Sequence, residues 1–516
     1  MAQADPQTVF PVYNAAEDLL SRNLTAERRD RTAYVDDAGR YSFAELDARA
    51  NRVANALKGL GLEREDRLAL CLLDGIDWPS VFLGAMKAGV IPVAISTMLT
   101  PADYDYLLRD SRAKALVVAG AILPQFAPIL AGQPYLRQVI TAGGGGGGLD
   151  LATLMETASA SFEAAPTSAD ESGFWQYSSG TSGPPKGVVH VHGALVQTAE
   201  LFAGQVLGLN GEDVLYSAAR LFFGYGMGNA LTFPLAFGAT AVLSAERPTP
   251  ASVAQILKTH KPTVFFGVPT LYASLLASEH LPARDDVALR LCVSAGETLP
   301  AEIGRRWSEH FGVEIIEGIG STEMLHIFLS NRPGAVRYGV TGKPVPGYEV
   351  RLVDEAGQPV ARGEIGELHV KGPTSAAGYW AKRDKTRETF LGPWTRSADK
   401  FVETEDGDFI FCGRSDDMLK VGGIYVSPAE VEAAVMTHPA VIEAAVVGRA
   451  DEAGLIKPQA FVVAREGAAT GADLAADIQR HVKSQLAPYK YPRWIEFLPD
   501  LPKTPTGKIK RFMLRG

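Results

Sequence analysis

Residues 177–187 read YSSGTSGPPKG, directly after the apolar start of FWQY, and this stretch indicates the fold more strongly than any other in the chain. Such a loop can fold closely around phosphates, because glycines leave backbone N–H groups open to a ligand, and hydroxyls and an ammonium add further donors. The donors are the hydroxyls of Ser178, Ser179, Thr181 and Ser182, the backbone at Gly180 and Gly183, and Lys186. The stretch therefore predicts a phosphate-binding loop.

Two alternatives compete with this interpretation. A P-loop needs Gly-Lys followed by Ser or Thr, whereas here Pro185 precedes Lys186 and Gly187 follows it, so the spacing excludes that motif. The other alternative is a Ser- and Gly-rich turn with a solvated lysine, and the loop alone leaves that open.

Three further segments carry charge in a suggestive order. In EGIGSTEMLHIF, Thr322 and Glu323 follow a glycine-rich turn, and the Glu323 carboxylate could hold magnesium against ATP phosphates. Asp399 in RSADKF and Arg414 in CGRSDD form an acid and a base of the kind that contacts ribose. Lys508 lies in PKTPTGKIKR, near the end of the chain. Taken singly, each reads as a surface charge or a basic tail.

The apolar pattern predicts an α/β fold in two domains. Ser42 and Glu45 form a capping-box signature before an amphipathic helix that ends near Gly59, and short apolar strands alternate with helices, as in parallel sheets covered on both faces. We expect a large N-terminal domain of layered sheets and helices at 1–415 and a small, mobile α+β domain at 416–516. The connecting segment GRSDDMLKVGG is charged and ends in two glycines, which suits a hinge.

Composition excludes several classes of protein. The 516 residues are 46% hydrophobic, and the net charge of -9 offers no basic field for nucleic acid. Three scattered cysteines fit neither a disulfide framework nor a zinc site, and the pair His190 and His192 lacks a third metal ligand.

The N-terminus shows no signal sequence, so we expect a cytoplasmic protein. The uncharged stretch 221–245 contains four glycines and a proline and is interpreted as a buried loop and strand, without a membrane span. The glycine run 143–148 is interpreted as a surface loop.

Taken together, the four segments resemble the adenylate-forming superfamily of acyl-CoA synthetases, peptide-synthetase adenylation domains and beetle luciferases, over nearly the whole chain. The resemblance implies that ATP adenylates an acid, with Mg²⁺, and that the acyl group then passes to coenzyme A. It implies catalytic roles for Lys508, Thr322 and Glu323. It implies ATP contacts from the loop 178–183 and from Lys186, Gly296, Glu297, Gly318, Ile319, Thr322, Asp399, Arg414 and Lys508. It also implies a hinge at Asp416 and a CoA-facing segment with Lys420, Gly422 and Gly423.

A narrower resemblance, to benzoate:CoA ligases and their hydroxybenzoate relatives, rests on LFFGYGMGNALTFPLAFGA, SAGETLP and GSTEMLHIFLSN. It implies an acid pocket lined by Phe223, Gly224, Tyr225, Gly226, Ala295, Gly296, Glu297, Gly318, Ile319, Gly320, His326 and Ile327. Such walls suit a flat ring. We expect Gly224 to leave room for a ring substituent. For His326 two interpretations stay open, a contact to the acid or a satisfied core histidine.

Two departures from the superfamily pattern concern local geometry. Gly318, Ile319 and Gly320 stand where many relatives have a tyrosine that stacks on adenine, and Ser397-Ala398-Asp399 stands where Thr-Gly-Asp is common.

The competing functions are loading of a carrier protein, luciferase-like oxygenation and non-catalytic acyl or nucleotide binding. No carrier domain follows Gly516, which favours free CoA, and we expect a monomer or homodimer.

Overall fold

Short apolar runs separated by helices build two mainly parallel sheets in the computed structural model, which describes residues 10–144, 148–178, 184–415, 417–421, 424–452, 455–487, 489–503 and 509–515. The chain divides into two compact units. The larger comprises Met1–Tyr338, Pro344–Glu349 and Lys371–Thr395, and the smaller comprises Gly339–Lys343, Val350–Val370 and Arg396–Gly516. The expected boundary between 415 and 416 concerns a point of rotation, which compactness does not address, so it stays a prediction.

One sheet of the larger unit has nine strands. In spatial order they are β16 (Lys343–Pro344), β15 (Ile327–Ser330), β14 (Ile315–Gly320), β13 (Leu291–Ser294), β12 (Val264–Gly267), β10 (Val214–Ser217), β11 (Thr240–Val242), β1 (Thr32–Val35) and β2 (Arg40–Ser42). The pairs from β14 through β13, β12, β10 and β11 to β1 are all parallel, whereas β15 and β2 run antiparallel to their neighbours. The carboxyl ends of five or more strands therefore meet at one edge of this sheet.

The second sheet of the larger unit has eight strands. Their spatial order is β19 (Gly378–Tyr379), β9 (Lys186–Val191), β8 (Ser172–Ser178), β4 (Ile91–Ala94), β3 (Arg67–Cys71), β5 (Ala115–Ala119), β6 (Gln138–Ala142) and β7 (Leu149–Asp150). Alternate residues of β3 face opposite layers. Leu68 and Leu70 pack in the core with α2 and α3, whereas Ala69 and Cys71 pack with Tyr104 of α4. The sheet is thus covered on both faces, as the apolar runs predict.

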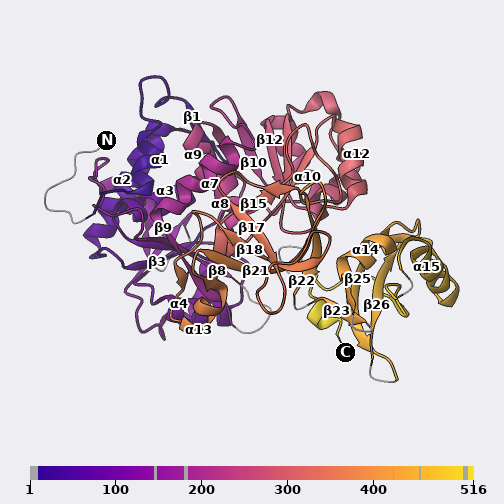
Figure 1. Cartoon of the computed structure of the whole chain (residues 1–516). Coiled ribbons are helices and arrows are strands. Elements are labelled where there is room, and N and C mark those ends of the chain that lie inside the picture. Colours follow the sequence, from indigo (N-terminus) through magenta and orange to yellow (C-terminus); the bar gives the residue numbers. More distant parts are fainter. Residues whose placement is uncertain are drawn as a thin grey trace. The chain divides into compact units, whose positions relative to one another are not determined.

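The helices of the larger unit follow the expected pattern. They are α1 (Ala15–Ser21), α2 (Phe43–Gly59), α3 (Asp77–Lys87), α4 (Pro101–Ser111), α5 (Leu123–Leu130), α6 (Leu151–Thr157), α7 (His192–Thr198), α8 (Gly224–Met227), α9 (Phe233–Phe237), α10 (Pro250–Thr259), α11 (Pro269–Leu276), α12 (Ala301–Phe311) and α13 (Arg383–Thr389). Shorter turns are the π-helical η1 (Ala199–Gly204) and η2 (Gly228–Thr232) and the 3₁₀ turns η3 (Arg284–Asp286) and η4 (Thr322–Met324). The capping box of Ser42 and Glu45 is present at the start of α2, which packs on α3 (Figure 1).

The smaller unit combines two helices with sheets that contain both antiparallel and parallel strand pairs. One sheet contains, in order, β17 (Glu349–Val353), β18 (Ile365–Lys371) and β21 (Trp394–Glu403), with β22 (Phe409–Arg414) also paired to β21, and it precedes the hairpin of β23 (Leu419–Val421) and β24 (Ile424–Val426). The short strand β20 (Phe390–Leu391) belongs to the larger unit. Beyond it lie α14 (Pro428–Met436), β25 (Val441–Ala450), β26 (Ile456–Ala464), α15 (Ala472–Gln485), β27 (Trp494–Phe497) and the 3₁₀ turn η5 (Arg511–Met513). The predicted fold class, a large α/β part and a small α+β part, is confirmed.

The uncharged stretch 221–245 corrects one expectation. The structure forms α8, η2 and α9 before β11, where the sequence analysis expects a loop and a strand. Tertiary packing overrides the low helix propensity of glycine here, since a Cβ on Gly226 would lie 2.0 Å from the Arg220 carbonyl oxygen. Within the described part of the chain, no helix combines the length and the apolar character needed to cross a bilayer. Of the glycine run, residues 145–147 lie outside the described residues.

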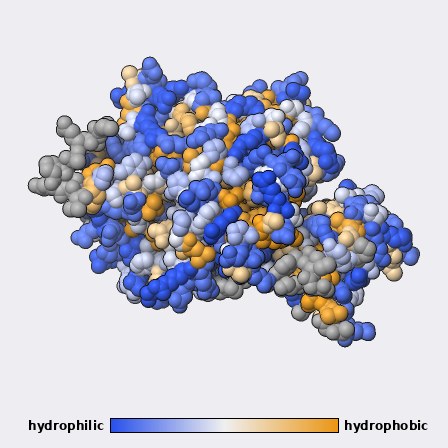
Figure 2. Space-filling model, viewed as in Figure 1, coloured by the Kyte–Doolittle hydropathy of each residue, from blue (hydrophilic) through white to orange (hydrophobic). Residues whose placement is uncertain are grey.

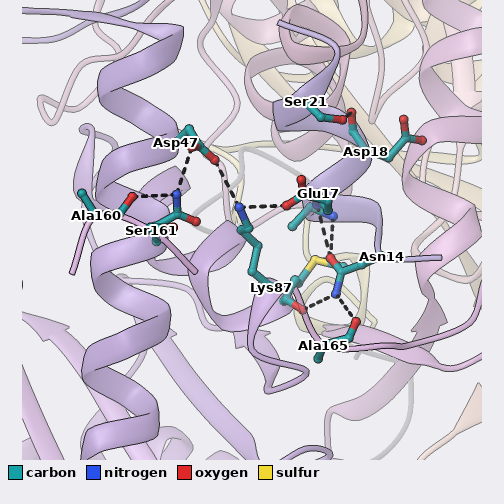
Figure 3. Close-up of polar contacts among 12 residues, drawn as sticks. Asn14, Glu17, Asp18, Ser21, Asp47, Lys87, Ala160, Ser161 and Ala165 are labelled. Atoms are coloured by element: carbon teal, nitrogen blue, oxygen red, sulfur yellow. Dashed lines mark hydrogen bonds and ion pairs between the residues drawn. The ribbon is translucent and has the colours of Figure 1, made fainter. Parts of the chain in front are cut away.

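A buried lysine joins the first three helices (Figure 3). Lys87, the last residue of α3, is 2% exposed, and its ammonium lies 2.8 Å from Glu17 Oε2 of α1 and 3.2 Å from Asp47 Oδ1 of α2. Beside it, Asn14 caps α1 and donates to the Met86 carbonyl at 2.8 Å. These contacts fix the N-terminal helix on the layer that covers β3 and β4. On the outer surface, apolar side chains are scattered among hydrophilic ones (Figure 2), as is usual for folded proteins.

Candidate functional site

The predicted phosphate loop is held at both of its described ends. In the antiparallel pair of β8 and β9, Ser178 stands opposite Lys186. Tyr177 donates to Asp110 Oδ2 at 2.7 Å, and Tyr106 donates to the Pro185 carbonyl at 2.9 Å, so both ends of the loop are tied to α4. The candidate residues Ser179, Gly180, Thr181, Ser182 and Gly183 lie outside the described residues.

Two indoles lie close together at this hairpin, with their ring planes tilted by 36°. Trp175 of β8 and Trp380 lie 4.8 Å apart between ring centroids, and the guanidinium groups of Arg67 and Arg112 lie over the Trp380 ring at 5.5 Å each. Trp380 Nε1 donates to the Asp110 carbonyl at 2.9 Å. The residue that receives the Tyr177 hydroxyl bond therefore also anchors an indole.

The structure brings Lys186 and Glu323 to the same aromatic side chain, although they are far apart in sequence. Glu323 lies in η4, which begins after Ser321, whose hydroxyl caps the Met324 N–H. Tyr379 donates to Glu323 Oε1 at 2.7 Å, and the Lys186 ammonium lies 4.4 Å from the centroid of the Tyr379 ring. A cation and an anion suited to a metal-bound phosphate thus flank one tyrosine. Thr322 is the first residue of the same turn.

The predicted acid pocket lies at the carboxyl ends of parallel strands, where α/β sheets bind ligands. Ala295 and Gly296 follow β13, and Gly318, Ile319 and Gly320 end β14. These three residues pair with β15, with an irregular register between Ile319 and Gly320. Gly296 has a φ of +92°, and nothing lies within 4 Å of a Cβ placed there. Glu297 is partly exposed beside it.

His326 is enclosed by aromatic rings. It is 3% exposed, and its ring lies 4.7 Å from Phe233 and 5.6 Å from both Phe202 and Tyr225, between centroids. Burial lowers the pKa of His326 to about 3, so the imidazole is neutral near pH 7. Nε2 lies 3.2 Å from Asn229 Oδ1 and 3.3 Å from the Tyr225 carbonyl oxygen.

These partners assign the tautomer of His326. Both are oxygen acceptors, so Nε2 carries the proton and Nδ1 carries the lone pair. Among the described residues Nδ1 has no hydrogen-bond partner. One ring nitrogen is thus satisfied by the core, and a contact of the other nitrogen to the acid stays a prediction.

The glycines of the pocket serve close backbone packing. A Cβ on Gly224 would lie 2.4 Å from the Leu325 carbonyl oxygen, which corrects the expectation that this glycine leaves room for a ring substituent. The Leu325 backbone, with φ of +67°, already fills that space. A Cβ on Gly228 would lie 2.3 Å from His326 Cδ2. At both positions glycine lets the chain pack closely against a neighbouring backbone or ring.

The remaining wall residues occupy defined places. Phe223 caps α8 and its ring lies 4.5 Å from that of Phe222. Tyr225 donates to the Val293 carbonyl at 3.1 Å, at the end of β13. Ile327 begins β15, and its Cγ2 would lie 2.8 Å from a Cβ on Gly318. Aromatic and aliphatic side chains thus meet the strand ends.

Sequence reasoning gave no role to several polar residues that the structure places here. Glu317 of β14 is 4% exposed, accepts the Leu299 N–H at 3.0 Å and has a pKa raised to about 8 by burial. Gln176 of β8 and Asn229 of η2 are buried as well, and Tyr379 contacts Glu323. Glu317 opens the motif EGIGSTE, and a charged residue inside an apolar strand was the available signal.

The smaller unit contains the predicted ribose pair. Asp399 and Arg414 are direct partners in the register of β21 and β22, and Arg414 Nη1 donates to Asp399 Oδ1 at 3.1 Å. Ala398 adopts φ of +60°, the left-handed conformation that favours glycine. Asp416, Gly422, Gly423 and Lys508 lie outside the described residues, and of Lys420 only the backbone, in β23, is described.

The histidine pair is structural. His190 is fully buried and stacks on Phe174 at 4.9 Å, and His192 Nδ1 accepts the Ala15 N–H at 3.2 Å. Among the residues that the structure describes, no group of three or more His, Cys, Asp or Glu side chains could hold a metal.

The sequence matches the family model described as AMP-binding enzyme over residues 21–380, and the model described as AMP-binding enzyme C-terminal domain over residues 430–508. The chain belongs to the AMP-binding enzyme family. This AMP-binding enzyme is similar to the benzoate–CoA ligase of Thauera aromatica, with 57% identity over 98% of this chain and 96% of that protein.

Two further relatives agree. The 4-hydroxybenzoate–CoA/benzoate–CoA ligase of Rhodopseudomonas palustris is 49% identical to this AMP-binding enzyme over 98% of the chain and 94% of that protein. A crystal structure of a benzoate CoA ligase from Burkholderia xenovorans superposes with a TM-score of 0.92 at 51% identity, covering 98% of this chain and 100% of that one. The suspected superfamily and its narrower aromatic branch are both confirmed.

Proposed function

We propose that this AMP-binding enzyme is an ATP-dependent aromatic acid:CoA ligase that acts on benzoate or a hydroxybenzoate. It would form aroyl-AMP and pyrophosphate, and then aroyl-CoA and AMP. The observation that carries the proposal is the 57% identity, over 98% of the chain, to a benzoate–CoA ligase. Loading of a carrier protein and non-catalytic binding are less supported, because relatives at this identity are named as CoA ligases.

The chemistry of the pocket fits a benzene ring. Phe223, Tyr225, Ile327 and the rings around His326 offer flat apolar walls, which bury an aromatic acid well. The neutral His326 can accept a hydrogen bond at Nδ1, so a ring hydroxyl would find an acceptor there. The unsubstituted ring of benzoate would leave that acceptor unused, which costs little binding free energy. We propose that both acids are accepted.

Adenylation requires the union of two anions, a carboxylate and the α-phosphate of ATP. We propose that Lys186 and Lys508 neutralise phosphate and carboxylate charge and that the loop 178–183 holds the phosphates. Glu323 would hold magnesium, which would supply further charge neutralisation when bound. Glu323 fits this role, because Tyr379 takes Oε1 and, among the described residues, Oε2 has no hydrogen-bond partner. Asp399 and Arg414 would hold the ribose.

The second half-reaction would use the small C-terminal part. We propose that rotation about Asp416 withdraws Lys508 and brings Lys420, Gly422 and Gly423 to the acyl-adenylate, where glycines let a pantetheine arm approach closely. The mixed anhydride reacts with water, so its retention until the thiol arrives favours a closed site. We keep a cytoplasmic location, the absence of nucleic-acid partners and a monomeric or homodimeric state as predictions.

The test is a product analysis. Purified protein is incubated with ATP, magnesium and CoA and with benzoate, hydroxybenzoates, aminobenzoates or medium-chain fatty acids, and AMP and acyl-CoA are measured by mass. Equal amounts of AMP and aroyl-CoA from the aromatic acids would support the proposal. AMP without acyl-CoA would indicate another acceptor, and no AMP with any acid would contradict it.

The predicted lysine has its own variant. Lys508→Ala should abolish benzoate-dependent exchange of pyrophosphate into ATP while ATP binding persists, because the ammonium is needed where charge develops in the transition state. Lys510→Ala is the matched control two residues away and should keep the exchange. Unchanged exchange in Lys508→Ala would remove this mechanism.

A further inference from the structure

Residues 374–379 of the larger unit hold the turn that carries Glu323 by three hydrogen bonds. The Thr374 hydroxyl donates to the Met324 carbonyl at 2.8 Å, and the Ala376 N–H donates to the Glu323 carbonyl at 2.8 Å. The third contact is the 2.7 Å bond from the Tyr379 hydroxyl to Glu323 Oε1. Backbone and side chain of Glu323 are therefore both positioned by residues 374–379.

Tyr379 is itself fixed. It is 7% exposed, and its N–H donates to Thr386 Oγ1 at 3.0 Å. As part of β19 it pairs with Val188 of β9, and its ring lies 5.4 Å from Phe390 in an edge-to-face arrangement. A ring held on its edge, at its backbone and at its hydroxyl has little freedom to turn.

The face of that ring meets Lys186. The ammonium lies 4.4 Å from the ring centroid, within the range of a cation–π contact. β19 also pairs directly with β9, which begins at Lys186, so the spacing between ring and lysine is set by hydrogen-bonded backbone. One tyrosine thus contacts the lysine through its face and the carboxylate through its hydroxyl.

We propose that Tyr379 is a positioning residue that holds Lys186 and Glu323 at a fixed spacing for one metal-bound triphosphate. The inference rests on the proposed function, since it takes magnesium–ATP as the ligand of this pair. The hydroxyl orients the carboxylate toward the metal, as outer-shell hydrogen bonds do in metal sites. The ring orients the ammonium toward the phosphates. Each half of the tyrosine therefore has a separate effect.

Two variants separate the halves. Tyr379→Phe keeps the ring and loses the hydroxyl, so the concentration of Mn²⁺ at half-saturation of the ATP complex should rise about 10-fold or more, while metal-free ATP binds within about 2-fold of the parent. Tyr379→Leu loses both the aromatic ring and the hydroxyl, so metal-free ATP should also bind about 3- to 10-fold more weakly. Mn²⁺ binding is read by electron paramagnetic resonance and ATP binding by calorimetry, both without an acid substrate.

Tyr13→Phe is the matched control, because Tyr13 donates to the Asp18 carboxylate at 2.9 Å in a comparable pair away from this site. It should leave both affinities unchanged. The inference is overturned if Tyr379→Phe leaves the Mn²⁺ half-saturation within 2-fold of the parent, or if it weakens metal-free ATP equally.

The same experiment separates this inference from the proposed function. A parent enzyme that forms aroyl-AMP, with a Tyr379→Phe variant of unchanged Mn²⁺ affinity, overturns the inference alone. A parent that binds Mn²⁺–ATP in a Tyr379-dependent way but forms no aroyl-AMP overturns the proposed function and supports the inference.

Discussion

Gly228→Ala tests whether His326 forms a wall of the acid pocket. The added Cβ would lie 2.3 Å from His326 Cδ2 and 2.5 Å from Nε2. Carbon atoms in contact prefer about 3.5 Å, so the ring must move by about 1 Å. Such a shift lengthens the bonds of 3.2 Å to Asn229 and 3.3 Å to Tyr225 beyond hydrogen-bond range and presses the ring against Phe233.

The expected magnitude follows from overpacking, which costs about 1–3 kcal/mol. If the displaced ring lines the acid site, that energy corresponds to about a 5- to 150-fold lower kcat/KM for benzoate. The assay measures benzoate-dependent AMP formation at saturating ATP, together with ATP affinity and the melting temperature. ATP affinity should change by less than about 2-fold, because the change is confined to the acid side.

Gly39→Ala is the control, since nothing lies within 4 Å of a Cβ there. It should leave activity and melting temperature unchanged. If Gly228→Ala lowers the melting temperature but keeps the benzoate KM, His326 is only a core residue. If neither quantity changes, the packing described around His326 is refuted.

Substitutions at three further positions test local physics. Burial raises the pKa of Glu317 to about 8, so the stability that its neutral form gives is present below about pH 4.5 and is lost as the pH rises toward 8. The difference in melting temperature between Glu317→Gln and the parent should therefore favour the variant more at pH 8 than at pH 5. Ala398→Val, at φ of +60°, should lose about 1–3 kcal/mol of unfolding free energy in urea titrations, whereas Ala398→Gly should stay within about 1 kcal/mol of the parent. Lys87→Met leaves the carboxylates of Glu17 and Asp47 without their cation and should cost about 1–3 kcal/mol, with faster hydrogen exchange in α1; unchanged exchange would contradict the role given to this lysine.

Much of the fold could be predicted because local and global preferences agree. The capping box at Ser42 and the apolar strand from Arg67 identify their elements without tertiary information. The helices of the stretch 221–245 could not be predicted in this way. Glycine propensity argues against a helix, and only close contacts, such as that of Gly226 with the Arg220 carbonyl, reverse the preference.

The site was predictable where chemistry is carried by charge. Asp399 and Arg414 were paired from sequence, and they are cross-strand neighbours. Tyr379 was not found, because its hydroxyl and its ring act on residues more than fifty positions away, and no local pattern reports such contacts. The role of Gly224 was misread for a related reason, since the direction of an absent Cβ is a property of the folded backbone.

The close pair of Trp175 and Trp380 gives the protein a built-in optical reporter. Asp110 binds both the Trp380 indole and the Tyr177 hydroxyl, and Trp175 lies two residues before Tyr177 on the same strand. A ligand that displaces Tyr177 or Asp110 would shift the polarity and quenching of these indoles, with Arg67 and Arg112 as adjacent charges. Such a displacement can therefore be followed in real time by intrinsic fluorescence, without a label and in every variant that keeps the two tryptophans.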